Sequence, residues 1–313
     1  MFINLLKLAL KSIISQRQQS LISAAGLSVA LSCGILILLY VQYELSFDNY
    51  HNNAENIYRI ISKHATGFSY MGKDLFAVTP PSLKYALVND IPEIENSTKC
   101  RLIAHTLEYK SSLFLETGFL YIDSDFLKIF TFPVISGNPV EEMKEPFTLF
   151  ITEEMAEKYF GNEEAVGKTI KADNKYIFTV RGVLKNIPDN SHFNFNFLTG
   201  IETLYSERGG KEKVETWSNF SYLTYVQLHD NVVPENISGK LMELTEKYLP
   251  KEPFFKGMQL IPVPLRTIHL GGALNFDPGN NSDIRYIYLI ISIGIFILLI
   301  ACFNYVNMAT ARA

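Results

Sequence analysis

The chain contains very little cysteine. Only three of its 313 residues are cysteines, and two of them, Cys33 and Cys302, lie inside long apolar stretches. Cys100 is therefore alone in the region between these stretches. That region can form no internal disulfide and no cysteine-rich metal cage. It spans about 240 residues, which is enough to build an apolar core without such cross-links.

The sequence also lacks the residue patterns of common catalytic and metal sites. Its six histidines show neither HxxxH nor HExxH spacing, and no GxSxG motif is present. His192 follows Ser191 and lies near Asp189, but catalytic triads are not built from such close neighbours in one turn. We interpret this segment as a turn that hydrogen-bonds its own backbone. We therefore predict no catalytic residue, no cofactor and no metal, and we do not expect an enzyme.

One segment resembles a phosphate-binding loop but departs from it in three ways. Gly161 and Gly167 enclose five residues, where the Walker motif needs four, although Lys168 and Thr169 follow as in that motif. A helix is predicted before the loop and a strand after it, the reverse of the required order. Two glutamates within the loop would also repel phosphate. We interpret Gly161–Thr169 as a structural turn.

Basic residues are scarce in the middle of the chain. Four of the 28 lysines and arginines lie outside residues 44–311, which leaves 24 against all 32 aspartates and glutamates. The middle region therefore has a net charge of −8. Such a balance argues against nucleic acid as a partner and against adhesion to anionic lipid through a basic face.

Two uncharged apolar stretches, residues 18–43 and 286–311, bracket this acidic region. Each 26-residue stretch would extend roughly 39 Å as a helix, which exceeds the roughly 30 Å hydrocarbon core of a bilayer. We predict that both are transmembrane helices. The region 44–285 between them is then a domain outside the membrane.

The charges at the ends of the stretches predict their orientation. Lys7, Lys11 and Arg17 precede the first stretch and Arg312 follows the second, so both outer ends carry the positive charge typical of the cytoplasmic side. The first stretch is too long for the apolar core of a signal peptide and has no small-residue cleavage site after it. We expect an uncleaved anchor in the inner (plasma) membrane, with the N-terminus in the cytoplasm.

Residues 1–17 predict a third membrane element. Apolar side chains fall on one face of a helix there and lysines on the other, which is typical of a helix lying on the cytoplasmic membrane surface. The alternative is a simple extension of the first transmembrane helix. Membrane lipid is therefore an expected partner.

The region 44–285 alternates short strand-like runs with helices, which indicates an α+β fold. The order predicts two lobes, with residues 112–215 inserted into an outer lobe formed by 46–111 and 216–270. Alternating phenylalanines predict a half-buried strand over 193–197. We expect these phenylalanines, together with Trp217, Phe220, Tyr222 and Tyr225, to pack in the core.

Small and polar residues inside the two apolar stretches predict helix pairing. Gly26 and Gly34 would let another helix approach closely, and Asn304 and Asn307 need hydrogen-bonding partners in hydrocarbon. The two helices could pair with each other, so a partner outside this chain is suggested but not required.

Five sets of segments together resemble the MacB/FtsX-type permeases, and most of all the large permeases of Bacteroidetes-type bacteria. In chain order they are Asp125–Phe130 with Gly137–Pro139, Ile151–Gly161 with Ala165–Lys168, Gly182–Pro188 with Asn190–Phe193, Leu265–Leu270, and Ile300–Arg312. The resemblance covers essentially the whole chain in order.

The resemblance implies a membrane subunit of an ABC export system. Such a permease has a bilobed periplasmic core domain, with a porter-like lobe and an inserted smaller lobe, between its first two transmembrane helices. A separate cytoplasmic ABC ATPase drives motion that the helices relay to this domain. The implied partners are that ATPase, a second permease copy or a C-terminal half of the permease, and a periplasmic adaptor.

Members of this family continue past the second helix, whereas the present sequence ends at Ala313. We therefore expect an N-terminal portion of a permease. The alternative within the same fold is an FtsX-like signalling subunit that regulates a periplasmic partner. The size of the outer region, about 240 residues, resembles the MacB-type core more than the smaller loop of FtsX-like proteins.

Overall fold

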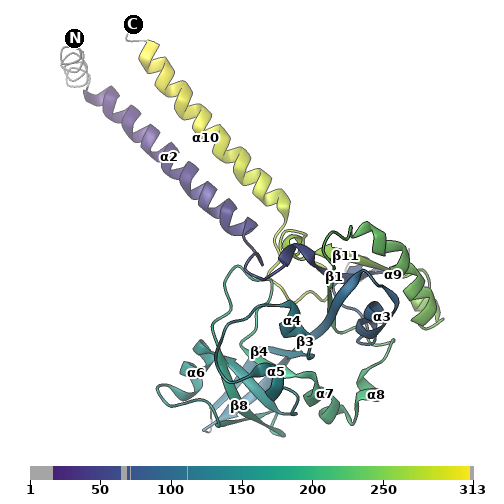
Figure 1. Cartoon of the computed structure of the whole chain (residues 1–313). Coiled ribbons are helices and arrows are strands. Elements are labelled where there is room, and N and C mark those ends of the chain that lie inside the picture. Colours follow the sequence, from purple (N-terminus) through teal and green to yellow (C-terminus); the bar gives the residue numbers. More distant parts are fainter. Residues whose placement is uncertain (1–16, 65–68, 71, 111, 311–313) are drawn as a thin grey trace. The chain divides into compact units, whose positions relative to one another are not determined.

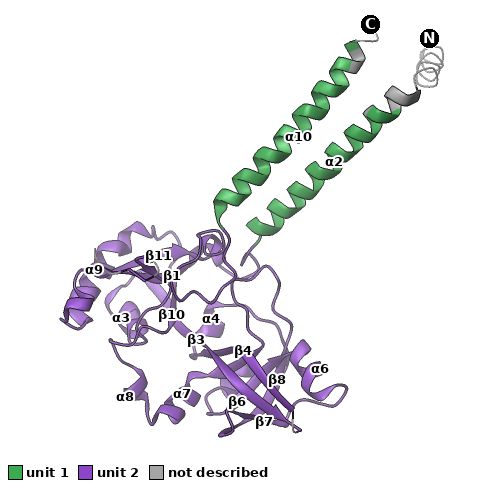
Figure 2. Ribbon diagram, turned by 180° about the vertical axis from the view of Figure 1, so that it is seen from behind, with its two compact units in different colours: residues 1–46, 283–313 green, residues 47–282 purple. Residues whose placement is uncertain are grey.

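The protein is described here from a computed structural model that covers residues 17–64, 69, 70, 72–110 and 112–310. It divides into a helical unit and a domain, drawn in different colours in Figure 2. The helical unit contains residues 1–46 and 283–313, and the domain contains residues 47–282. The predicted surface helix at 1–17 lies almost wholly outside the described residues.

The helical unit consists of helices α2 (Arg17–Leu45) and α10 (Ile284–Thr310). Within them, Ala24–Leu45 and Ile284–Asn307 are long and apolar enough to cross a membrane, with mean hydropathies of 2.3 and 2.7. Only 6% and 11% of these segments are buried in the structure. Core helices of soluble proteins are mostly buried instead, so the exposure of these two fits lipid-facing helices.

The two helices pack against each other at small residues. A Cβ atom at Gly294 of α10 would lie 3.0 Å from Cδ1 of Ile37 in α2, and one at Gly26 would lie 3.9 Å from Nδ2 of Asn304. Close approach at glycines is typical of helix pairs in membranes. The predicted small-residue surface of α2 therefore faces α10 of the same chain.

The described residues of the domain form eleven strands and several short helices, whose arrangement Figure 1 shows. The strands are β1 (Ile57–Lys63), β2 (Leu75–Phe76), β3 (Ile94–Tyr109), β4 (Ser112–Ile122), β5 (Val134–Ser136), β6 (Thr148–Thr152), β7 (Thr169–Ala172), β8 (Tyr176–Leu184), β9 (Phe197–Gly200), β10 (Leu223–Leu228) and β11 (Gln259–Pro264). The α-helices are α3 (Leu83–Asp90), α4 (Phe126–Ile129), α5 (Pro139–Glu142), α6 (Glu153–Phe160), α7 (Ile201–Arg208), α8 (Lys211–Val214) and α9 (Glu235–Tyr248). The 3₁₀ helices are Ala54–Asn56, Pro253–Phe255 and Leu265–Thr267.

One part of the domain is a split β-α-β arrangement. Its strands lie in the order β11-β1-β10-β3, and all neighbours are antiparallel. Helix α3 connects β1 to β3 and helix α9 connects β10 to β11, as in ferredoxin-like folds. Figure 1 shows α3 and α9 beside these strands. This is the expected outer, porter-like lobe.

Both helices cover the same face of this sheet. Tyr58 and Ile60 of β1 pack with apolar residues of α3 and α9, such as Leu87 and Leu241. Because side chains alternate along a strand, the intervening Arg59 points to the opposite face. On that face Arg59 meets the carboxylate of Asp277.

The second part of the domain is a closed ring of strands. The pairings run from β3 to β4, β9, β6, β8 and β7 and return to β3. Closure of a sheet leaves its strands with paired edges and encloses a core. That core is built from buried residues such as Phe119, Leu149 and Phe178.

Strand β3 belongs to both parts, and a further apolar cluster contains residues of both, among them Ile57, Leu120 and Leu265. The domain is therefore an α+β fold with two lobes that share a strand and a core. No single residue separates them, and the boundaries at about 112 and 215 stay a prediction.

The prediction of a strand over 193–197 is wrong in its position. The ladder begins only at Phe197, which pairs with Phe119. The chain before it crosses Gly118 so closely that a Cβ atom there would lie 3.1 Å from the Asn196 nitrogen. Phe193 and Phe195 are nevertheless buried, at 3% and 1% exposure. Their alternation reflects core packing and not strand pairing, so the expected core role of these two phenylalanines is confirmed.

Candidate functional site: a buried network at the two connecting segments

Two short segments connect the domain to the helices. The entry segment, residues 47–51, follows α2, and the exit segment, residues 276–282, precedes α10. Several charged and polar side chains of these segments are buried in the domain. These side chains have partners on the sheet and in the turn 190–192. We call the side chains and their partners together the junction network.

Asp48 is the centre of the entry segment and is fully buried. Its Oδ1 accepts a hydrogen bond from the backbone nitrogen of His192 at 3.0 Å, and the His192 ring Nδ1 lies 2.8 Å away. The Asp48 nitrogen in turn donates to the Asn190 carbonyl at 2.9 Å. The entry segment is thus tied to a turn more than a hundred residues along the chain.

The same turn also binds Tyr50, which lies two residues after Asp48 in the entry segment. Tyr50 donates a hydrogen bond to Ser191 Oγ at 2.8 Å, and Ser191 Oγ accepts another from the Phe193 nitrogen at 3.1 Å. The backbone hydrogen bond is the one expected from sequence. The ring of His192 uses its nitrogens toward Asp48 and the Tyr225 hydroxyl, at 2.8 and 2.9 Å. Because the His192 ring faces those two groups, it is not placed as a base for Ser191.

Arg59 and Asp277 form the second half of the network. The two guanidinium nitrogens donate to the two carboxylate oxygens at 3.0 and 2.8 Å, and the side chains are only 2% and 1% exposed. A bidentate pair of this kind is the strongest geometry for such ions. It fastens the exit segment to β1.

His269 joins the two segments. Its ring stacks on Phe47, with centroids 3.4 Å apart and planes 4° from parallel. Its Nδ1 lies 2.7 Å from the carbonyl oxygen of Asn280, and its own carbonyl accepts from the Ser282 nitrogen at 2.6 Å. His269 therefore contacts the first residue of the entry segment with its ring and the exit segment with both its ring and its backbone carbonyl.

Burial controls the charge state of the network. Burial alone would raise the pKa of Asp48, but His192 and His51 outweigh it and the pKa is lowered, so the carboxylate stays charged. Burial lowers the pKa of His51 to about 3, which keeps this imidazole neutral. Its Nδ1 accepts a hydrogen bond from the Thr131 nitrogen at 3.1 Å, as a neutral ring can.

A second buried cluster holds the two lobes together around Asp123. The carboxylate accepts hydrogen bonds from Thr98 Oγ1 at 2.7 Å and from the Lys99 nitrogen at 3.0 Å. Lys84 of α3 lies 2.8 Å from the same carboxylate. Because α3 belongs to the outer lobe and Asp123 follows β4 of the ring, this cluster opposes movement of one lobe against the other.

The phosphate-loop-like segment Gly161–Thr169 links α6 to β7, which is the predicted order. Lys168 pairs with Glu163 inside the loop, and Lys110 lies 3.4 Å from the same carboxylate. Lys168 hydrogen-bonding lowers the pKa of Glu163. The lysine thus has a partner within its own turn. Over the described part of the chain, no group of three acidic, histidine or cysteine side chains is arranged to hold a metal ion.

A family model for the MacB-like periplasmic core domain matches residues 20–244 of this chain. The chain belongs to this family. Its members are components of ABC transporter permeases, in which the ATPase is a separate subunit. The match, with two candidate membrane helices, makes this a membrane protein with a periplasmic-type core domain.

One solved structure shares the fold of the core domain, and two others show a weaker likeness to it. A domain of a protein classed as a permease, from Porphyromonas gingivalis, is 21% identical, with a TM-score of 0.59, and the match covers 68% of this chain and 91% of that one. The periplasmic region of MacB from Actinobacillus actinomycetemcomitans is 16% identical, with a TM-score of 0.49 over 69% and 91%. The extracellular domain of the ABC-type transporter YknZ from Gram-positive bacteria is 15% identical, with a TM-score of 0.47 over 66% and 100%. No curated protein matches the chain.

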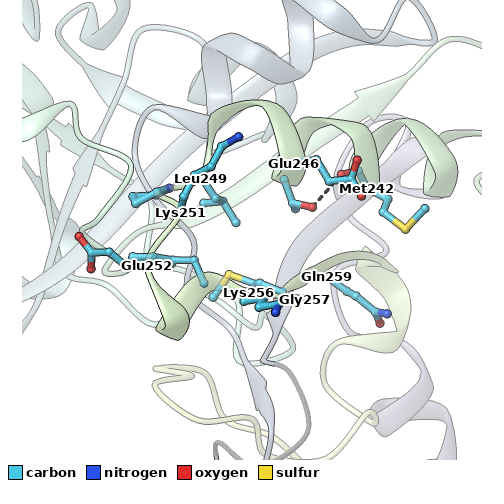
Figure 3. A pocket seen from close by; sticks show the side chains of 12 residues that line it. Met242, Glu246, Leu249, Lys251, Glu252, Lys256, Gly257 and Gln259 are labelled. Atoms are coloured by element: carbon cyan, nitrogen blue, oxygen red, sulfur yellow. Dashed lines mark hydrogen bonds between the residues drawn. The ribbon is translucent and has the colours of Figure 1, made fainter.

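The core domain also has an open pocket of about 490 Å³ at the C-terminal end of α9 (Figure 3). Leu249, Phe255 and Met258 supply apolar walls. Its charged lining residues are two lysines and two glutamates, namely Lys251, Lys256, Glu246 and Glu252. Equal numbers of opposite charges do not select a ligand of either sign.

Sequence reasoning missed the junction network because its partners are far apart in the chain. One signal was available. Arg59 interrupts the apolar run Ile57–Ile61, and an arginine in the middle of a buried strand requires an anionic partner. The identity of that partner, Asp277, depends on the fold.

Proposed function

We propose that this chain belongs to a permease subunit of an ABC export system. In this proposal the motion of a separate cytoplasmic ATPase reaches the core domain through α2 and α10. The observation that supports it best is the junction network, which fixes the entry segment to the turn 190–192 and the exit segment to the sheet by buried charged contacts.

The physical reason is that a mobile connection would absorb motion. A segment held by several buried hydrogen bonds and an ion pair has few alternative arrangements, so a displacement at one end moves the elements to which it is tied. Asp48 ties the entry segment to the turn 190–192, and Asp277 ties the exit segment to β1. Motion entering by either helix would therefore reach both lobes.

Partner capture tests this function. An affinity-tagged chain is purified from membranes of its host in mild detergent, beside an unrelated tagged protein with two transmembrane helices, and co-purified proteins are identified by mass spectrometry. We expect an ABC ATPase to be enriched about tenfold or more over the control. Enrichment of a periplasmic hydrolase without any ATPase would favour the FtsX-like signalling role, and enrichment of neither would contradict the export proposal.

We further propose that the core domain faces the periplasm and the N-terminus the cytoplasm. Asn162 lies in the exposed Gly161–Thr169 loop, whereas Cys100 is fully buried. In a Cys33→Ala/Cys302→Ala background, Asn162→Cys is expected to react with a membrane-impermeant maleimide in intact spheroplasts. Lys7→Cys in the same background is expected to react only after the membrane is opened. The reverse pattern would overturn the orientation.

A further inference from the structure

A cleft of about 490 Å³ opens on the core domain where β3, the start of β10 and the exit segment meet. It is separate from the pocket of Figure 3, although Phe220 in its wall stacks on Phe255 of that pocket, with ring centroids 5.7 Å apart. Volumes of 300–1,000 Å³ are typical of small-ligand sites. The apolar part of the lining consists of Val78, Leu102, Phe220, Leu223, Phe276 and Pro278.

The charge of the cleft is positive and comes from one side chain. Two charged residues line it, Arg101 and Asp277. The carboxylate of Asp277 is matched by the bidentate contact with Arg59. No carboxylate in the described ranges lies within ion-pairing distance of Arg101, whose guanidinium carbon sits 5.4 Å from the centre of the Tyr222 ring. A half-buried guanidinium held on an aromatic ring is prepared to accept an anion.

Phe276 at the edge of the cleft has two unusual features. Its φ angle is +55°, a left-handed conformation that is uncommon for a bulky residue. Its side chain is also 59% exposed, and its ring stacks on Tyr70 with centroids 5.2 Å apart. A strained backbone that holds an aromatic ring in solvent calls for a function. Here the ring extends the apolar wall of the cleft outward.

We propose that this cleft binds a small amphipathic anion, which has an acyl or aryl body and a single carboxylate group. The carboxylate lies on Arg101. The apolar body lies against Leu102, Leu223 and Phe220. The mixed charges of the pocket in Figure 3 offer no such selection.

This site goes beyond the relay function, because binding needs neither an ATPase nor motion. It also touches the relay. Phe276 and Pro278 belong to the exit segment, so an occupant of the cleft contacts the chain that leads to α10.

Photolabelling tests the site in the full chain. The protein is placed in nanodiscs of phosphatidylcholine, which carries no net charge, and irradiated with a diazirine-bearing decanoate; labelled peptides are located by mass spectrometry. Label on α2 and α10 measures the probe dissolved in the lipid. Relative to that label, we expect strong labelling of peptides containing residues 101–102, 220–223 and 276–278. The neutral amide of the same probe is expected to label them at least about tenfold less, because the charge-assisted contact is lost.

Variants separate the charge of Arg101 from its packing. Arg101→Gln is expected to lower cleft labelling at least about tenfold, whereas Arg101→Lys retains most of it. Arg181→Gln is the matched control, because Arg181 is an exposed arginine on β8 of the ring, and it is expected to change nothing. Three results would each overturn the proposal. They are equal labelling by the acid and the amide, equal labelling of the Arg101→Gln and Arg181→Gln variants, and label confined to α2 and α10.

Discussion

Replacing Arg59 with methionine should destabilise the core domain by roughly 3–5 kcal/mol, which is the usual cost of removing one partner of a buried ion pair. The carboxylate of Asp277 would remain 1% exposed with its charge uncompensated. The loss can be measured through Cys100, which is fully buried and whose thiol pKa is raised by burial. Its modification by maleimide across a urea series, in a Cys33→Ala/Cys302→Ala background, reports the unfolding of the domain alone.

A double-mutant cycle identifies the cause of this loss. If the stranded Asp277 charge is responsible, Arg59→Met/Asp277→Leu should recover about 1–3 kcal/mol relative to Arg59→Met. Arg266→Met is the control, because Arg266 pairs with Glu55 at 3.5 Å with both side chains about half exposed or more. Such surface pairs contribute about 1 kcal/mol or less. Equal losses for Arg59→Met and Arg266→Met, or no recovery in the double variant, would contradict the assignment.

The cycle also bears on the proposed relay. Arg59 on β1 is the main side-chain attachment of Asp277, and Asp277 lies in the exit segment before α10. The double variant keeps a packed side chain at both positions but removes the bidentate contact. A permease that relays motion through this segment should therefore lose transport in the double variant even where the domain remains folded.

Local sequence patterns predict the helix before the Gly161–Thr169 loop, which is α6. Thr152 caps α6 by accepting a hydrogen bond from the Met155 nitrogen at 3.4 Å, and Gly161 ends that helix with a φ of +61°. Both signals act within a few residues of each other, so they can be read from sequence. The apolar helices α2 and α10 were equally clear, since their length and composition leave few alternatives.

Contacts between distant residues could not be predicted in the same way. Asp48 and His192 are adjacent only because the entry segment passes beside the turn 190–192. The closed ring depends on β7 pairing with both β3 and β8, and no local pattern states that pairing. The phenylalanines at 193 and 195 were misplaced in a strand because their alternation is the same for an extended buried chain as for a paired strand.

Lowering the pH from 6.5 toward 4 should destabilise the core domain through His51. The pKa of His51 is lowered to about 3 in the fold from 6.5, so in this range the unfolded chain binds a proton that the folded chain does not. Stability therefore falls as pH falls, by about 3 kcal/mol from this residue over this range. Asp48 acts in the same direction at lower pH, since its pKa is lowered from 3.8 and its contribution is lost only below that value.

The variant His51→Asn isolates this effect, because asparagine does not titrate and offers an oxygen to the Thr131 nitrogen. Asp48, His192 and Tyr50 are the titratable groups that face His51, and all three are retained. His64, whose pKa is also lowered by burial, adds a slope of the same sign to both proteins, so the comparison removes it. His229→Asn is the control, since His229 is exposed. Measured by Cys100 modification between pH 4 and 7, the stability of His51→Asn should depend on pH much less than that of the unaltered chain. Parallel curves would mean that burial does not lower the pKa of His51 in the fold, and would contradict the prediction.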